Sequence, residues 1–265
     1  MINQEALRVK YNPEGSELRK LQHQLMELMM VLDGICKENN IPYMLTGGNV
    51  LGAVRHGGFI PWDDDIDIAL LKKDYKCLLR ILRNYKSDKY VLQEHRSDPD
   101  YIQPFPKFRE KTGSFLGSNP NRGCLYKYKG VAIDIFCMTP ISQLNARICA
   151  IIHRRLLSWT YKIKNKQARH RLTSILVGCE KILFLFCNIL NITRRHNEMH
   201  HAQGQAPCHV LINRNHLLPY TRMLFEGEML PVPRDTDGFL RLFYGPDYMK
   251  IPDEIKIHNK DLLFK

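Results

Sequence analysis

The sequence of 265 residues predicts an α/β (α+β) protein in which helices flank a sheet and a basic helical segment is inserted. Three observations support this fold class. Apolar residues recur at three- and four-residue steps in long segments, which is typical of amphipathic helices. Short runs of alternating or apolar residues between those segments indicate strands. A stretch rich in Lys and Arg follows the last of these strands and again carries a helical stripe of apolar residues.

The elements of the core follow from these patterns in chain order. A stripe of leucines predicts a helix that begins near Ser16 and ends at the Asn39-Asn40 pair. The next expected elements are a strand at 41–46, a Gly47-Gly48 turn, a strand at 63–70, a helix at 73–84 and strands at 91–92, 105–109 and 131–136. Prolines concentrated after Gln205 indicate loops and short elements that close the domain.

The positive charge of the chain is concentrated in one segment. The whole sequence has a net charge of +12, and residues 141–200 alone contain eleven Lys or Arg against Glu180 and Glu198, a net charge of +9. Two amphipathic helices are expected there, at about 148–159 and 172–190, joined by the polar stretch 162–171. We therefore expect a single domain over 1–265, with a core at 1–140, the basic amphipathic segment at 141–205 and a closing segment at 206–265.

An excess of positive charge suits a polyanionic partner, which is nucleic acid, an anionic membrane surface or a phosphorylated substrate. A nucleic-acid-binding protein is one alternative, but the sequence has no recognisable nucleic-acid motif, so we expect no nucleic-acid partner. Apolar stripes flanked by Lys and Arg at 141–200 instead suit a peripheral helix on an anionic membrane. The competing interpretation is that these stripes pack on the core and the charges are solvated.

The ends of the chain and its cysteines bear on location. Residues 1–16 contain no apolar stretch of the secretory type, and the longest uninterrupted apolar run, at 182–187, is far shorter than the ~18 residues of a membrane span. The eight cysteines include no Cys-x-x-Cys pair, which favours reduced thiols. These features predict a cytoplasmic protein, and the membrane interpretation of 141–200 would place it at the inner face of the cytoplasmic membrane.

Acidic residues cluster where the second strand is expected to start. On a strand, Asp63, Asp65 and Asp67 would share one face, while Ile66 and Ile68 would turn to the core. Crowded carboxylates repel one another unless cations bind them, and Mg²⁺ or Mn²⁺ takes such oxygen ligands together with phosphate. A solvated acidic turn is the alternative.

A calcium loop is a further interpretation of the same aspartates, because Asp63, Asp65 and Asp67 stand at its first, third and fifth positions. It fails because the sixth position is Ile68 instead of Gly and the twelfth is Asp74 instead of Glu. The cluster is therefore not an EF-hand loop.

A second acidic strand follows at 131–136, where Asp134 is surrounded by apolar residues. A lone carboxylate in an apolar strand needs a partner. That partner is either a Lys or Arg, or a metal ion held jointly with Asp65 and Asp67 in a geometry suited to phosphoryl displacement. Upstream, Gly47-Gly48 can let backbone amides approach a phosphate closely.

The run Gly-Asn-Val-Leu-Gly-Ala-Val-Arg-His-Gly-Gly-Phe-Ile-Pro-Trp-Asp-Asp-Asp-Ile-Asp-Ile at 48–68 closely resembles the LicD family. These proteins are phosphocholine transferases of bacterial surface glycans and are related to fukutin and the fukutin-related protein. The resemblance continues at Asp74-Tyr75, 105–109, 133–136, 231–233, 244–249 and His258. It covers most of the chain except the basic segment.

The resemblance implies a nucleotidyltransferase-like mixed sheet flanked by helices. It also implies that Asp65, Asp67 and Asp134 are the catalytic metal ligands, with Asp63 and Asp64 supporting them. The residues implied in substrate or phosphate binding are Gly47, Gly48, Asn49, Arg55, His56 and Lys107. The family usually has Thr or Ser where this chain has Asn49, and commonly has Pro-Arg where this chain has Leu71-Lys72.

The reaction implied is the transfer of a phospho-alcohol group from a CDP-linked donor such as CDP-choline. The acceptor would be a sugar hydroxyl of a glycan or lipid-linked glycan, such as a lipopolysaccharide or teichoic acid precursor. A second possibility within the same enzyme class is nucleotidyl transfer from a nucleoside triphosphate to a small molecule. The first reaction releases CMP and the second releases pyrophosphate, so the products separate the two.

Overall fold

The structure is a computed structural model, and it describes residues 4–113, 125–140, 151, 158–160, 162–192, 198–202, 210–252 and 255. The helices are α1 (Gln4–Tyr11), α2 (Glu17–Glu38), α3 (Gly48–His56), α4 (Lys72–Asn84), α7 (Ser158–Thr160), α8 (Lys166–Ile192), α9 (Arg214–Leu217) and α10 (Thr236–Tyr244). The strands are β1 (Met44–Leu45), β2 (Ile66–Leu71), β3 (Tyr90–Gln93), β4 (Lys107–Glu110), β5 (Ala132–Thr139), β6 (Glu198–Ala202), β7 (Ile212–Asn213), β8 (Thr221–Phe225) and β9 (Glu228–Val232).

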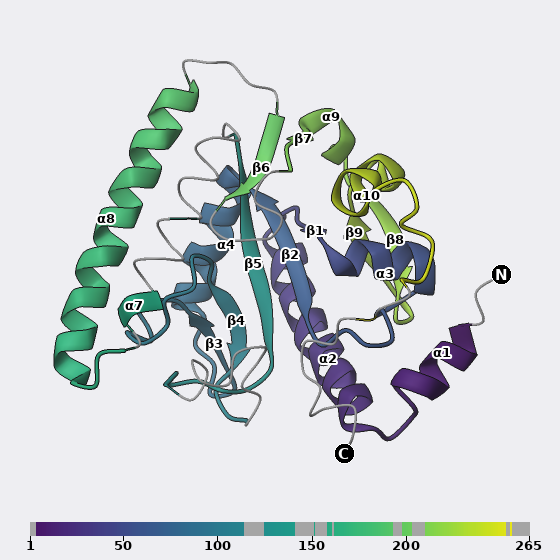
Figure 1. Ribbon diagram of the computed structural model, residues 1–265, viewed down its shortest axis with the longest axis horizontal. Helices are drawn as coiled ribbons and strands as arrows, with labels where there is room; N and C mark the ends of the chain where they lie inside the picture. The colour runs from purple at the N-terminus through teal and green to yellow at the C-terminus, as the bar shows by residue number, and fades with distance from the viewer. Residues whose placement is uncertain are drawn as a thin grey trace.

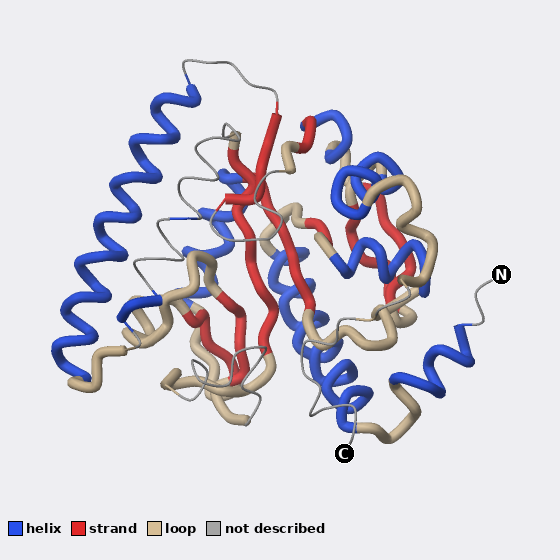
Figure 2. The backbone as a smooth tube through the Cα atoms, viewed as in Figure 1, coloured by secondary structure: helices blue, strands red, loops and turns tan. Residues whose placement is uncertain are grey.

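The central sheet is mixed and has the strand order β1-β2-β5-β4-β3, while β6 pairs with β5 and with β7 (Figure 1). Strands β2 and β5 are parallel, whereas β1, β4 and β3 join the sheet through antiparallel pairs. Helix α2 packs against β5 and β4, and α4 packs against β2, β3 and β5. The α+β fold class with helices flanking a mixed sheet is therefore confirmed, as the distribution of helix and strand in Figure 2 shows.

The core helices and strands form where the apolar periodicity predicts them. Helix α2 begins after Ser16, whose hydroxyl accepts a hydrogen bond from the backbone N–H of Arg19, and its leucine stripe is buried. Helix α4 and strands β3, β4 and β5 lie within a few residues of the expected ranges. The strand expected at 41–46 is shorter, because only Met44–Leu45 pairs with β2.

The strand expected at 63–70 begins three residues later than predicted, at Ile66. The prediction that Asp63, Asp65 and Asp67 share a strand face is therefore wrong for the first two residues, which lie in the loop before β2. The carbonyl groups of Asp63 and Asp65 accept hydrogen bonds from side chains instead of a neighbouring strand. These side-chain hydrogen bonds hold the backbone of the loop in place, and the strand does not extend into it.

The basic segment differs from its prediction as well. Helix α8 begins at Lys166, so six of the ten residues of the expected connecting stretch 162–171 are helical. The side chain of Asn165 accepts a hydrogen bond from the N–H of Ala168, which is the contact of an N-cap. Most of the helix expected at 148–159 falls outside the described residues. The segment then returns to the sheet as β6.

The C-terminal hairpin β8–β9 packs against the start of the molecule. Its turn residues Glu226 and Gly227 both have positive φ angles, 51° and 89°. The Glu226 carboxylate accepts a hydrogen bond from the N–H of Phe59 at 3.1 Å and forms an ion pair with Arg19 of α2 at 2.8 Å. The hairpin is thus fixed to the loop after α3 and to α2 by one buried carboxylate.

Candidate active site

Three of the predicted site residues stand side by side across the central sheet. Asp67 of β2 is the Cα partner of Asp134 of β5, and Asp134 is the partner of Lys107 of β4. Paired residues of neighbouring strands project to the same face of a sheet. The ammonium group of Lys107 donates a hydrogen bond to the carboxylate of Asp134. Both partners that the sequence allowed for Asp134, a lysine and a shared cation, are therefore compatible with this row.

The loop before β2 brings three further carboxylates together. One oxygen each of Asp63, Asp64 and Asp65 lies within 4.8 Å of the others. The side chain of Gln22 donates a hydrogen bond to the carbonyl of Asp63 at 2.9 Å and fixes the start of this loop to α2. The loop therefore presents its carboxylates from a fixed backbone.

Asn49 of α3 fixes the other end of the same loop. Its side-chain amide donates to the carbonyl of Asp65 at 3.0 Å, and its side-chain oxygen accepts from the backbone N–H of Asp67 at 2.6 Å. The side chain of Asn49 is buried. Both of its polar atoms are used by the backbone of the acidic segment, so Asn49 acts here as a clamp, and the phosphate contact implied for it stays a prediction.

The carboxylates of the cluster repel one another when they are ionised and no cation is bound. Burial, and then the carboxylates of Asp65 and Asp134, raise the pKa of Asp67 well above its usual range, while Lys107 opposes this rise. Burial and the carboxylates of Asp65 and Asp64 likewise raise the pKa of Asp63. A group of carboxylates that resists ionisation in this way is stabilised by any cation placed among them.

The glycines before Asn49 allow the helix to approach these carboxylates. Gly47 has a φ angle of 56°, a conformation that favours glycine. A Cβ atom on Gly48 would lie 2.8 Å from a carboxylate oxygen of Asp63. The N-terminus of α3 therefore lies directly beside the acidic loop, where its free N–H groups favour negative charge. Phosphate binding by Gly47 and Gly48 stays a prediction that this position supports.

Arg55 and His56, at the end of α3, contact the C-terminal part of the chain. The guanidinium of Arg55 donates to His56 Nε2 at 2.8 Å and to the carbonyls of Tyr248 and Lys250 at 2.9 and 3.0 Å. Burial, followed by the charges of Arg55 and Arg8, lowers the pKa of His56 to about 4. His56 is therefore neutral at pH 7, and Arg55 holds the loop 248–250 in place.

Tyr244, at the end of α10, has no predicted role but is linked electrostatically to the acidic cluster. Burial and the carboxylates of Asp63, Asp67 and Asp65 raise the pKa of its phenol, and Arg55 opposes this rise. The Tyr244 side chain is still 45% exposed, so its burial is partial. Tyr244 opens the Tyr-Gly-Pro-Asp-Tyr-Met run at 244–249, which is one of the segments that resemble the LicD family. His258 lies outside the described residues.

The donor set fits a divalent cation such as Mg²⁺ or Mn²⁺. The groups available are all hard carboxylate oxygens, from Asp63, Asp64 and Asp65 in the loop and from Asp67 and Asp134 on adjacent strands. The arrangement resembles the carboxylate sets that bind two cations for an in-line displacement at phosphorus. The ligand set Asp65, Asp67 and Asp134 itself stays a prediction.

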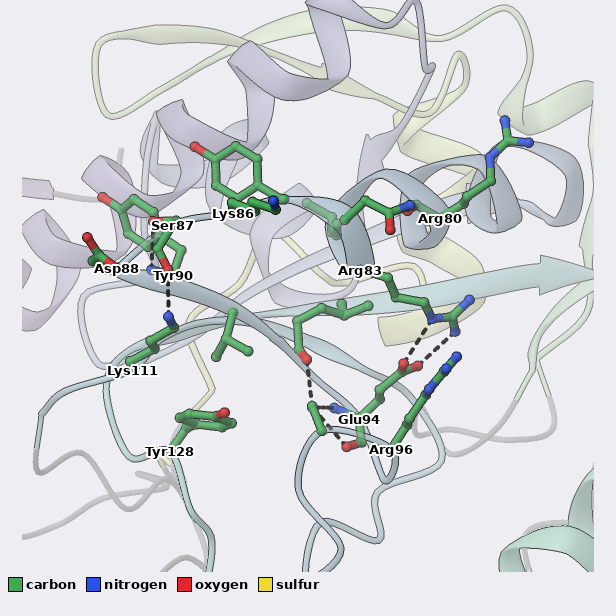
Figure 3. A pocket seen from close by; sticks show the side chains of 16 residues that line it. Arg80, Arg83, Lys86, Ser87, Asp88, Tyr90, Glu94, Arg96, Lys111 and Tyr128 are labelled. Carbon is green, nitrogen blue, oxygen red and sulfur yellow. Dashed lines mark hydrogen bonds and ion pairs between the residues drawn. The ribbon is translucent and has the colours of Figure 1, made fainter.

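A separate pocket of about 800 Å³ lies between the C-terminal end of α4 and β3 (Figure 3). Its wall contains Arg83, which is held by two hydrogen bonds of 2.9 and 2.8 Å to the carboxylate of Glu94. Lys111 donates to the carbonyl of Ser87 at 2.6 Å on the opposite side. None of its lining residues belongs to the acidic cluster, so the pocket is a polar hollow distinct from that site.

A mixed sheet that carries carboxylates on two parallel strands, beside a helix opened by glycines, is the architecture expected of a nucleotidyltransferase domain. Residues 40–155 match the family model of the LicD/FKTN/FKRP nucleotidyltransferase domain, which supports a relationship to the LicD family over this part of the chain. The matched region contains every residue of the acidic cluster together with Asn49, Arg55, His56 and Lys107.

Characterised relatives match over shorter stretches. The lipopolysaccharide cholinephosphotransferase LicD of Haemophilus influenzae is 41% identical over 59 residues, which are 22% of each chain. The human ribitol 5-phosphate transferase FKRP is 40% identical over 50 residues, 19% of this chain and 10% of that protein. An uncharacterised protein of Rickettsia prowazekii is 38% identical over 73 residues, 28% of this chain and 27% of its own length. The matches thus span about a quarter or less of these relatives.

Proposed function

We propose that the protein is a metal-dependent transferase that moves a phospho-alcohol group, phosphocholine or a similar one, from a CDP-linked donor to a sugar hydroxyl of a cell-surface glycan or glycolipid precursor. The observation that carries the proposal is the row Asp67–Asp134–Lys107 beside the carboxylates of the Asp63–Asp65 loop. It is supported by the LicD family match over the same residues and by two relatives named as transferases of cholinephosphate and ribitol 5-phosphate.

Bound divalent cations would neutralise the charge that develops on the attacking and leaving oxygens. In the proposed step, the acceptor hydroxyl oxygen forms a bond to the phosphorus that carries the alcohol. The bond from this phosphorus to the bridging oxygen breaks, and CMP leaves with that oxygen. Asp134 accepts the hydroxyl proton, and Lys107, already hydrogen bonded to Asp134, balances its charge and contacts phosphate. Arg55 positions the loop 248–250.

The acceptor in this proposal is met at a membrane. Glycan precursors of the lipid-linked class are held in a bilayer, so an enzyme acting on them works at its surface. Among the described residues, none of the helices has both the length and the apolar composition needed to cross a bilayer. We accordingly propose a cytoplasmic enzyme that associates peripherally with the inner face of the cytoplasmic membrane.

The test is product analysis with CDP-choline, CDP-ribitol, CDP-glycerol and CTP, each supplied with Mg²⁺ or Mn²⁺. Release of CMP from one CDP-alcohol supports the proposal, whereas release of pyrophosphate from CTP indicates the nucleotidyl transfer reaction. Asp65→Ala and Asp67→Ala should lower CMP release at least a hundredfold with an unchanged circular dichroism spectrum. Asp88→Ala, which removes an exposed carboxylate, is the matched control and should retain activity. Turnover retained by either site variant would refute the assignment.

A further inference from the structure

Helix α8 presents a row of apolar side chains to the solvent. Their spacing of three and four residues places Leu172, Ile175, Cys179, Ile182 and Phe186 along one face, with Leu185 beside them. We call this row the outer face of α8. The exposed fractions are 62% for Ile175, 69% for Ile182 and 60% for Phe186. Solvent-exposed rows of large apolar residues usually mark an interaction surface.

The opposite face of α8 is fixed to the body of the protein. Arg169 is buried and donates a hydrogen bond to the carboxylate of Asp100 at 2.7 Å, and His170 lies 3.0 Å from the other oxygen of Asp100. Farther along, Ser174 and His95 are hydrogen bonded at 3.0 Å. These polar contacts set the rotation of the helix. The apolar row consequently faces away from the sheet, and Figure 1 shows α8 along the outer edge of the molecule.

Exposed basic side chains lie on α8 and in the stretch just before it. Lys162 and Lys164 precede the helix, and Lys166, Arg171 and Lys181 belong to it, all of them exposed. Within the described part of the chain, no carboxylate lies within ion-pair distance of these five groups. The segment 141–200 supplies only Glu180 and Glu198 as acids. An exposed apolar row on a helix in a segment with an excess of positive charge matches the interface of a bilayer that contains anionic lipid.

Trp159 is a further exposed apolar residue close to α8. It belongs to α7, which packs against α8, and 70% of its side chain is exposed. Tryptophan favours the boundary between lipid headgroups and acyl chains. A second copy of this chain is a poorer occupant, because a symmetric contact through the same row would bring the lysines and arginines of both copies together.

We propose that the outer face of α8, with Trp159 and the exposed lysines and arginines of the same segment, docks on the surface of an anionic lipid bilayer. The apolar residues Ile182, Leu185 and Phe186 enter the headgroup boundary, and the basic residues contact lipid phosphates. This inference extends the membrane location proposed above, but the contact needs neither substrate nor turnover. It assigns the contact to one face of one helix.

The test is flotation of the full chain with vesicles of neutral phosphatidylcholine, and with vesicles in which about a third of the lipid is phosphatidylglycerol. We expect binding to the anionic vesicles, weakened by raising the salt concentration, and at least tenfold less binding for the double variant Ile182→Ser/Phe186→Ser. The matched control is Leu224→Ser/Met229→Ser, which removes two apolar residues of similar exposure, 52% and 50%, from the β8–β9 hairpin and should bind as the wild type does.

Absence of binding to anionic vesicles would overturn the proposal, as would wild-type binding by the Ile182→Ser/Phe186→Ser variant. A wild-type dimer that becomes a monomer in this variant, with no vesicle binding by either, would assign the outer face to a second copy instead. Because flotation requires no catalysis, failure of the transferase reaction leaves this result unaffected. CMP release in detergent-free solution with a water-soluble acceptor reports on the catalytic site separately.

Discussion

Replacing Asn49 tests whether a neutral side chain holds the acidic segment in its binding geometry. Asn49→Ala removes the 2.6 Å hydrogen bond from the N–H of Asp67 and the 3.0 Å hydrogen bond to the carbonyl of Asp65. Two such bonds contribute about 1 kcal/mol each, and a buried N–H left without an acceptor costs about 1–3 kcal/mol. We therefore expect the free energy of unfolding to fall by about 2–4 kcal/mol.

Metal affinity distinguishes a clamp from a merely structural residue. Asn49→Ala releases the backbone between Asp65 and Asp67. The variant should therefore bind Mn²⁺ at least tenfold more weakly than the wild type, as measured by titration calorimetry at low temperature. Asn39→Ala removes a 2.8 Å hydrogen bond at the end of α2 and should leave Mn²⁺ affinity unchanged. In Asn49→Thr, the residue type common in the LicD family, the hydroxyl can accept from Asp67 but is too short to bridge both groups, so intermediate values are expected.

Two results would show that Asn49 does not hold the acidic segment. If Asn49→Ala unfolds in urea within about 0.5 kcal/mol of the wild type, the two hydrogen bonds do not stabilise the loop. If it is less stable but binds Mn²⁺ as tightly as the wild type, Asn49 supports the fold and does not position the carboxylates. In either case the clamp is refuted.

Three further predictions concern the surroundings of the site. Burial and neighbouring carboxylates raise the pKa of Asp67 above its value in the unfolded chain, so the cation-free protein should lose stability as the pH rises through that pKa. In thermal scans from pH 4 to 8 in EDTA, Asp67→Asn should make the melting temperature depend less on pH. If Asp67→Asn has the same pH dependence of stability as the wild type, repulsion between Asp67 and its neighbouring carboxylates does not destabilise the folded protein. Glu226→Gln removes the ion pair with Arg19, should destabilise the protein by about 1–3 kcal/mol in urea and should leave Mn²⁺ affinity unchanged. Arg55→Ala should accelerate deuterium exchange of the amides at 248–250 and raise KM more than it lowers kcat; unchanged exchange would show that Arg55 does not hold this loop.

The parts of the fold that were predictable depend on local periodicity. Helix α2, helix α4 and strand β5 each carry an apolar pattern that fits one backbone conformation. The loop before β2 also shows alternating residues, and this pattern led to a strand being expected from Asp63. What decides its conformation is a hydrogen bond from Gln22, 41 residues earlier in the chain, which no pattern within the loop contains.

The candidate site shows the same division between local and distant information. The acidic residues and Lys107 could be selected from their unusual positions in apolar strands. The run at 244–249 marks Tyr244 as a residue of interest but gives it no role, because α10 comes to pack against α3 only through the tertiary fold. The direction of the apolar stripe of α8 was equally undetermined. A stripe usually faces the core, and here the contact of Arg169 with Asp100, 69 residues away, turns it outward.

The separation of charge within the molecule constrains how the two proposed contacts can coexist. Carboxylates placed against an anionic membrane would be repelled, so an enzyme with a carboxylate-rich site must meet lipid through another surface. Figure 1 shows α8 on one side of the central sheet and α3 with α10 on the other, with β2 and β5 between them. The row Asp67–Asp134–Lys107 crosses these central strands. Docking through α8 therefore keeps the acidic cluster off the lipid phosphates while the protein remains at the bilayer, where a lipid-linked glycan can reach it.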